Sequence, residues 1–126
     1  MCGSLKHEGT LQKIGQDIFF IDKNTEKKGI WAGHARSETL KEKWLDRGCI
    51  PITIKADSFT EKDKAKKDHF FKVPEGWAIE GVLVTRPIDL GSYIHGPGEV
   101  LIVTRPAKGK EAKVHDRFPK FVRREK

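Results

Sequence analysis

Short runs in which apolar and polar residues alternate recur along the chain and predict β-strands. The clearest alternation lies in CIPITIKADSF (49–59), where Ile50, Ile52 and Ile54 fall on one face, as expected for a half-buried strand. Pro51 favours the start of this strand or a sheet edge. Strand-forming residues between turn residues predict four further strands: QDIFFID (16–22), HFFKV (69–73), WAIEGVLVT (77–85) and GEVLIVT (98–104).

One segment, RSETLKEKWLDRG (36–48), has the spacing of a helix. Ser37 is placed to act as its N-cap and Gly48 to end it. Three apolar residues share one of its faces: Leu40, Trp44 and Leu45. We expect an ordinary scaffold helix here. The polar segment KNTEKKG (23–29) and the segment DLGSYIHGPG (89–98) are expected to connect strands.

About six short strands and one clear helix predict an α+β domain that is mainly β, with a compact, barrel-like sheet and one or two helices. A chain of 126 residues can bury a core without a disulfide or a metal. No internal repeat or interdomain linker is apparent. We therefore expect a single domain over residues 1–126.

The chain is basic, with 25 Lys and Arg residues against 18 Asp and Glu residues and a net charge of +7. This balance favours a polyanionic partner such as nucleic acid. The charged run EKDKAKK (61–67) mixes both signs and also fits a solvated loop. No apolar run of 18 residues or signal-peptide pattern is present, so we expect no membrane partner.

The two cysteines, Cys2 and Cys49, form no CxxC pair, which argues against a zinc ribbon or a disulfide framework. Reduced thiols and a cytoplasmic location are expected, and Cys49 is expected to be a buried apolar thiol. Three further residues lack metal-ligand spacing: His7, His69 and His95. Neither a metal nor a cofactor is therefore predicted.

Five motifs occur in a recognisable order: MCG (1–3), ARSETLKEK (35–43), ADSFTEK (56–62), LIVTRPA (101–107) and VHDRFP (114–119). They follow the pattern MCGR, NAR-x-ET, ADG-[FW]-[YF]-EW, [IV]-[IV]-T-x-x-A and IHDR-x-P. In this order and over nearly the whole chain, the sequence resembles the SOS response-associated peptidase (SRAP) family.

The resemblance implies a β-rich domain that binds single-stranded DNA and crosslinks to abasic sites through an N-terminal cysteine. Removal of Met1 would give Cys2 both an α-amine and a thiol. An α-amine, with a reference pKa of about 7.7–8, is partly neutral at pH 7 and can attack the aldehyde of a ring-opened abasic sugar. The adjacent thiol would then close a thiazolidine ring. Self-removal of the leading residue is the only proteolysis expected.

The resemblance also assigns candidate roles in proton transfer. Glu61 and His115 match the acidic and histidine positions of the family, and both residue types suit general acid–base catalysis near neutral pH. His34 stands where the family usually has Asn, which would hold the cysteine or the sugar. The alternatives are a surface charge for Glu61 and a structural role for His115.

Four more residues are candidates for DNA contact. Arg36 and Arg117 match basic positions that would clamp phosphates; the alternative is a pair of structural salt bridges, with Glu38 and Asp116 as partners. Two aromatic residues could stack on bases or belong to the core instead: Trp31 and Phe59.

The chain departs from the family pattern at several positions. Ser4 replaces an Arg, and Ser58 and Lys62 interrupt the acidic motif. An alternative function is therefore a degenerate, non-catalytic module that binds nucleic acid or a protein. An N-terminal-nucleophile amidohydrolase would also use a leading Cys but needs a much larger domain. We expect a monomer whose partner is abasic single-stranded DNA, associated with the nucleoid if the source is bacterial.

Overall fold

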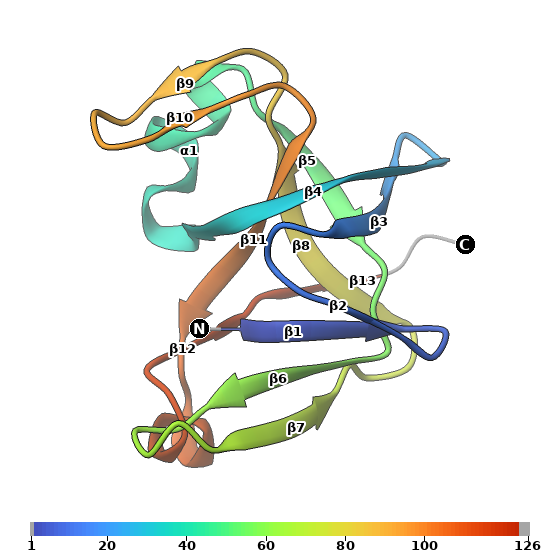
Figure 1. Ribbon diagram of the computed structural model, residues 1–126, viewed down its shortest axis with the longest axis vertical. Coiled ribbons are helices and arrows are strands. Elements are labelled where there is room, and N and C mark those ends of the chain that lie inside the picture. Colours follow the sequence, from blue (N-terminus) through green and yellow to red (C-terminus); the bar gives the residue numbers. More distant parts are fainter. Residues whose placement is uncertain (1, 124–126) are drawn as a thin grey trace.

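The computed structural model describes residues 2–123 (Figure 1). Its strands, in chain order, are β1 Cys2–His7, β2 Thr10–Gln12, β3 Asp17–Asp22, β4 Thr25–Arg36, β5 Ile50–Ile54, β6 Ser58–Lys62, β7 Asp68–Lys72, β8 Trp77–Leu83, β9 Ile88–Asp89, β10 Ile94–His95, β11 Glu99–Pro106, β12 Arg117–Pro119 and β13 Phe121–Arg123. The helical segments are η1 Ser37–Thr39, α1 Leu40–Lys43, η2 Leu45–Arg47 and η3 Gly109–Lys113.

Five strands close into a barrel. The larger sheet has the order β12-β11-β4-β3-β5-β8-β13, and β11 also pairs with β8, so β11, β4, β3, β5 and β8 form a ring. The long strand β4 runs parallel to β11 and antiparallel to β3. Closure of the ring removes exposed strand edges. The predicted mainly β, barrel-like domain with a short helix is confirmed.

A second sheet covers one end of the barrel. Its order is β2-β1-β6-β7, and Figure 1 shows it below the barrel strands. Leu5 on β1 and Phe59 on β6 join the barrel residues in one core. Phe59 stacks on Phe71 of β7 at 5.4 Å between ring centroids, and Phe118 of β12 contacts both rings edge-on. These aromatic contacts attach the second sheet to the segment that follows η3.

All five predicted strands are present, and β5 has the predicted alternation, with Ile52 and Ile54 buried. The segment predicted to connect at 23–29 is different. Lys23 and Asn24, with φ of 49° and 67°, make a two-residue hairpin turn, and β4 already starts at Thr25. The start of this strand was not predicted because its first four residues are polar and exposed and lack the alternation of a half-buried strand.

The predicted helix over 36–48 is wrong in length. β4 extends through Arg36, and the remainder forms η1, the four-residue α1 and η2. Trp44 interrupts the helix with φ −123° and is buried beside Cys49, so tertiary burial overrides local helix propensity. Ser37 does not cap the helix. Gly48 ends the segment in the left-handed region, as predicted, with φ 98°.

Cys49 and the segment over 89–98 were also predicted from the sequence. Cys49 is buried as predicted, and burial raises the pKa of its thiol. The segment predicted as a loop over 89–98 contains most of a small hairpin, β9–β10, which packs at the end of the barrel that carries α1 (Figure 1).

Gly81 tests the barrel packing. It lies on β8 between β5 and β11, and a Cβ there would clash with the Ile54 side chain and approach the Leu101 carbonyl. Gly81→Ala is expected to lower the free energy of unfolding by about 1–3 kcal/mol, measured by urea denaturation. Gly96→Ala is the control, because its Cβ would meet only ordinary contacts. Equal stability of the two variants would contradict this packing.

Candidate functional site

The first strand begins opposite a buried acid. β1 runs antiparallel to β6, and the register pairs the backbone of Cys2 with that of Glu61. Cα atoms of such paired residues are about 5 Å apart. The register shifts between Cys2 and Ser4, which is a β-bulge next to the start of the strand. The fold thus holds residue 2 beside Glu61, although 58 residues separate them in the chain.

Glu61 is an unusual carboxyl group. Its side chain is 0% exposed and projects from β6, so the reading of Glu61 as a surface charge is wrong. Burial raises its pKa from 4.5 to about 7, and the carboxylates of Asp116 and Glu111 act in the same direction. The turn after β6 and the 112–116 segment lie close together, because residues of both line one cavity. A carboxyl group with this pKa can donate or accept a proton at neutral pH.

His115 lies on the segment that faces β6. Its Nδ1 is 3.1 Å from the Arg117 backbone nitrogen and 3.0 Å from Asp116 Oδ1. A neutral ring accepts the Arg117 N–H at Nδ1, whereas a protonated ring directs Nδ1–H to the Asp116 carboxylate. The structure therefore provides a partner for each protonation state of His115.

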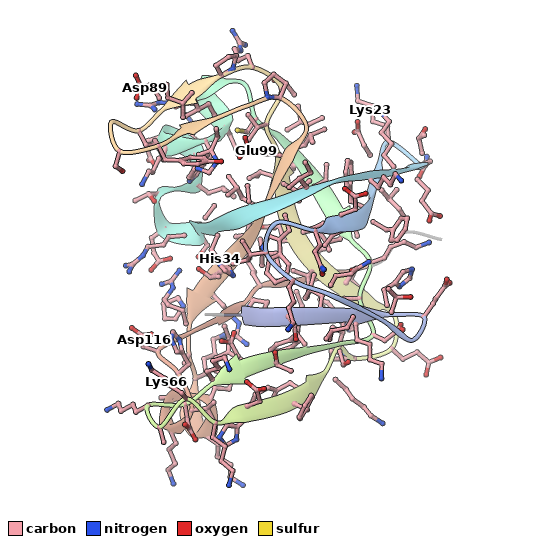
Figure 2. All side chains as sticks on the ribbon, in the orientation of Figure 1. Lys23, His34, Lys66, Asp89, Glu99 and Asp116 are labelled. Carbon is pink, nitrogen blue, oxygen red and sulfur yellow. The ribbon has the colours of Figure 1, made fainter. Side chains whose placement is uncertain are left out.

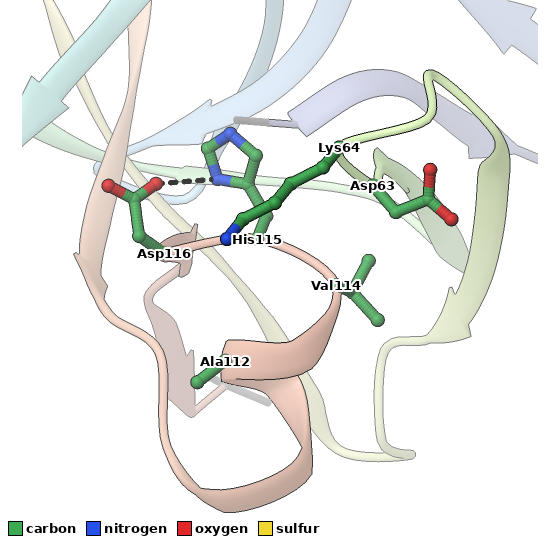
Figure 3. A pocket seen from close by; sticks show the side chains of 6 residues that line it. All are labelled: Asp63, Lys64, Ala112, Val114, His115 and Asp116. Atoms are coloured by element: carbon green, nitrogen blue, oxygen red, sulfur yellow. Dashed lines mark ion pairs between the residues drawn. The ribbon is translucent and has the colours of Figure 1, made fainter.

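A cavity of about 540 Å³ lies beside His115 and Asp116 (Figure 3). It is bounded by the β6–β7 turn on one side and by the segment between η3 and β12 on the other. Its lining residues are Asp63, Lys64, Ala112, Val114, His115 and Asp116. Figure 3 shows the Lys64 side chain reaching across toward His115 and Asp116. A small polar ligand would meet the imidazole of His115, the ammonium group of Lys64 and the carboxylate of Asp116 here, because the Asp63 carboxylate is bonded to its own turn and to His69.

His34 belongs to the same side of the molecule. It lies on β4, opposite Ile102 of β11, and Figure 2 shows it on the same side as Asp116. The ring is partly buried and contacts the Trp31 ring edge-on at 5.8 Å between centroids. β4 thereby supplies a third titratable group, in addition to Glu61 of β6 and His115 of the segment before β12.

Arg117 has a structural role. Its Nη1 and Nη2 donate to the two carboxylate oxygens of Glu38 at 2.6 and 2.9 Å, and Nη2 also donates to the Thr104 carbonyl oxygen at 2.8 Å. This guanidinium lowers the pKa of Glu38 to about 2. The predicted phosphate clamp is therefore corrected for Arg117, because its donors join η1 to β11. Arg36, at the exposed end of β4, remains a candidate.

The expectation that Trp31 and Phe59 stack on bases is also corrected. Both belong to the core, with 0% and 3% of their surface exposed. Trp31 donates its Nε1–H to the Gly33 carbonyl oxygen, and Phe59 stacks on Phe71. A buried ring presents no face to a base, so neither residue serves as a stacking platform.

Sequence reasoning missed the contribution of the β6–β7 turn. Asp63 and Lys64 line the cavity, yet they belong to the run interpreted as a solvated loop. Asp63 and Lys64 follow Glu61 closely in the chain, and a turn lies at the end of the strand that it follows. Their position in the sequence therefore indicates that they lie near Glu61.

These features define a small β-barrel protein with a buried carboxyl group on its second sheet and a cavity between the β6–β7 turn and the segment before β12. Comparisons of the chain with protein-family models, curated proteins and solved structures find no match. Within residues 2–123, no helix has the length and apolar character that crossing a bilayer requires.

The raised pKa of Glu61 predicts a pH-dependent stability. The folded protein holds this proton more tightly than the unfolded chain. Burying the ionised carboxylate therefore lowers the free energy of unfolding, by nothing below about pH 4.5 and by the full amount above about pH 7. Relative to the native protein, Glu61→Gln should gain about 3 kcal/mol of stability between pH 4 and pH 8.

Urea denaturation at the two pH values measures this difference. Glu75→Gln, on an exposed turn, serves as the control and should show no such gain. A stability difference between Glu61→Gln and the native protein that does not change with pH would refute the raised pKa.

Proposed function

We propose that the protein, after removal of Met1, forms a covalent crosslink to abasic sites in single-stranded DNA through Cys2. The observation that carries this proposal is the register of β1 on β6, which sets the backbone of Cys2 against the buried Glu61. The basic composition and the cavity beside His115 support a small, anionic sugar-phosphate ligand. The motif resemblance to the SRAP family supplies the reaction class.

The reaction needs no group that the chain lacks. The neutral α-amine of Cys2 attacks the aldehyde carbon of the ring-opened sugar and forms a C–N bond, giving a carbinolamine. Loss of the carbinolamine hydroxyl as water gives an imine. The thiol sulfur then bonds to the imine carbon while its proton passes to nitrogen, which closes the thiazolidine. One water is released in total, and the second attack is intramolecular.

Glu61 and His115 would act as the proton donors and acceptors of this reaction. Protonated Glu61 can donate to the sugar ring oxygen as the ring opens, since a pKa of about 7 leaves a large fraction of the acid form at neutral pH. His115 can protonate the departing hydroxyl, and its own charge change is accommodated by Asp116 at 3.0 Å.

The structural role of Arg117 favours a second candidate, a non-catalytic module that binds nucleic acid or protein. With Arg117 engaged by Glu38, one of the two expected phosphate contacts is lost. The two candidates differ in whether Cys2 is required, so an adduct assay with Cys2→Ala separates them.

The crosslink is tested with a single-stranded oligonucleotide that carries one abasic site. We expect the native protein to give an adduct that survives heating on a denaturing gel, and Cys2→Ala to give no heat-stable adduct because it lacks the thiol that closes the ring. Cys2→Ser is the matched control: it keeps the amine and a hydroxyl of similar size, yet should form at most a labile imine.

A binding signal that does not depend on Cys2, without any adduct, would support the non-catalytic module instead. An oligonucleotide without an abasic site provides the negative control for the adduct.

The role of His115 is tested with His115→Asn, which keeps an acceptor near the position of Nδ1 but cannot shuttle protons. The rate of crosslinking at saturating DNA should fall about 100-fold, whereas affinity for intact single-stranded DNA and the urea midpoint should be unchanged. A parallel loss of affinity and rate would mean that His115 serves binding or structure rather than proton transfer.

A further inference from the structure

An exposed aromatic ring stands on the edge strand of the second sheet. Phe70 on β7 is 77% exposed, the highest value among the large hydrophobic residues of the described chain that lie at the surface. It pairs with Thr60, and its neighbours Phe71 and His69 face the opposite side of the strand. Nothing in the core requires an aromatic residue at position 70.

Lysines surround this ring. Lys72 lies on the same face of β7 two residues away, and Lys6 of β1 is opposite Ser58, which is itself opposite Lys72. Lys62 lies on the same face of β6, where it pairs with Asp68 at 2.9 Å. The outward face of the second sheet therefore carries an aromatic ring together with two exposed lysines, Lys6 and Lys72, and the Lys62–Asp68 ion pair.

The turn that joins β6 to β7 is held in one conformation. The carboxylate of Asp63 accepts hydrogen bonds from the backbone nitrogens of Ala65 and Lys67 at 2.8 and 3.0 Å. Its second oxygen is 2.8 Å from Nε2 of His69. The bond with His69 is the main cause that lowers the pKa of Asp63, so this acid is ionised and engaged. The turn presents its other side chains from a fixed frame.

Those other side chains are cationic and available. Three lysines of the turn are exposed and form no ion pair with a side chain in residues 2–123: Lys64, Lys66 and Lys67. Lys64 also lines the cavity with His115. Figure 2 shows Lys66 at the tip of the hairpin, close to the side that carries Asp116. The positive turn thus adjoins the candidate site.

We propose that the β6–β7 hairpin is a docking surface for single-stranded nucleic acid, in which the turn lysines contact phosphates and Phe70 stacks on a base. Single-strand binders combine these two elements, a cationic track and a sequence-tolerant aromatic platform. The exposed lysines of the turn and of this face argue for a polyanion rather than an apolar protein partner. This inference names the strand-binding surface of the proposed crosslinking function and rests on it for its role.

The stacking role is tested by fluorescence anisotropy with a labelled single strand that contains no abasic site. Phe70→Ala should weaken binding by about 5-fold to 100-fold, whereas Phe70→Trp, which keeps an aromatic ring, should bind as the native protein does. Phe70→Leu keeps an apolar side chain without a π-face and should bind as weakly as Phe70→Ala. Leu11→Ala is the matched control, because Leu11 is 51% exposed on β2, the other edge of the same sheet.

The lysines are tested by the salt dependence of binding. Replacement of Lys64, Lys66 and Lys67 by Gln should reduce the slope of log Kd against log salt by about 2, as expected for three lost phosphate contacts on a single strand. The matched control removes three positive charges from the β3–β4 hairpin with Lys23→Gln, Lys27→Gln and Lys28→Gln. Figure 2 shows Lys23 on the side of the molecule opposite to Lys66.

Unchanged affinity in Phe70→Ala, full binding by Phe70→Leu, or equal salt slopes for the two triple variants would overturn the inference. Because the probe has no abasic site, these results do not depend on crosslinking. A protein that crosslinks but shows no effect of Phe70 refutes only the docking surface. A protein that binds through Phe70 but never crosslinks refutes only the proposed reaction.

Discussion

The antiparallel pairing of β1 with β6 is the constraint on which the rest of this protein depends. It fixes the backbone of Cys2 opposite Glu61, in a sheet whose inner face packs into the core through Leu5 and Phe59. A frayed first strand would leave Cys2 without a defined neighbour and would expose the Glu61 carboxyl to water. The burial that raises the pKa of Glu61 and the placement of residue 2 therefore have the same origin in this strand pair.

The barrel provides the rigid frame for this pair. Strands β4 and β11 lie parallel, and the bidentate bond of Arg117 to Glu38 ties the end of β4 to β11 and β12 through η1 and Thr104. His115 lies two residues before Arg117, the first residue of β12, so the same bond fixes the segment that carries it. Arg117 thus positions the segment that carries His115 through its bonds to Glu38 and Thr104. Under the proposed function, phosphate contacts would come from exposed cations, such as Arg36 and the turn lysines.

The sequence predicted the parts of this structure that depend on local pattern. Alternating isoleucines identified β5, and Gly48 was correctly placed at the end of the helical segment. The polar start of β4 and the burial of Trp44 could not be predicted, because pairing with β3 and core packing override local propensity there. The site shows the same division. Motif order suggested Glu61 and His115, whereas only the fold reveals that Trp31 is buried and Phe70 exposed.

The central claim is that both the amine and the thiol of Cys2 bond to one sugar carbon. Intact mass spectrometry of the adduct, with and without borohydride, tests it most directly. The account predicts the mass of the protein lacking Met1 plus the abasic oligonucleotide minus one water, with no gain of two hydrogens on reduction, and with the attachment mapped to residue 2. An adduct that retains Met1, that is attached to a lysine, or that gains two hydrogens as an imine would contradict it.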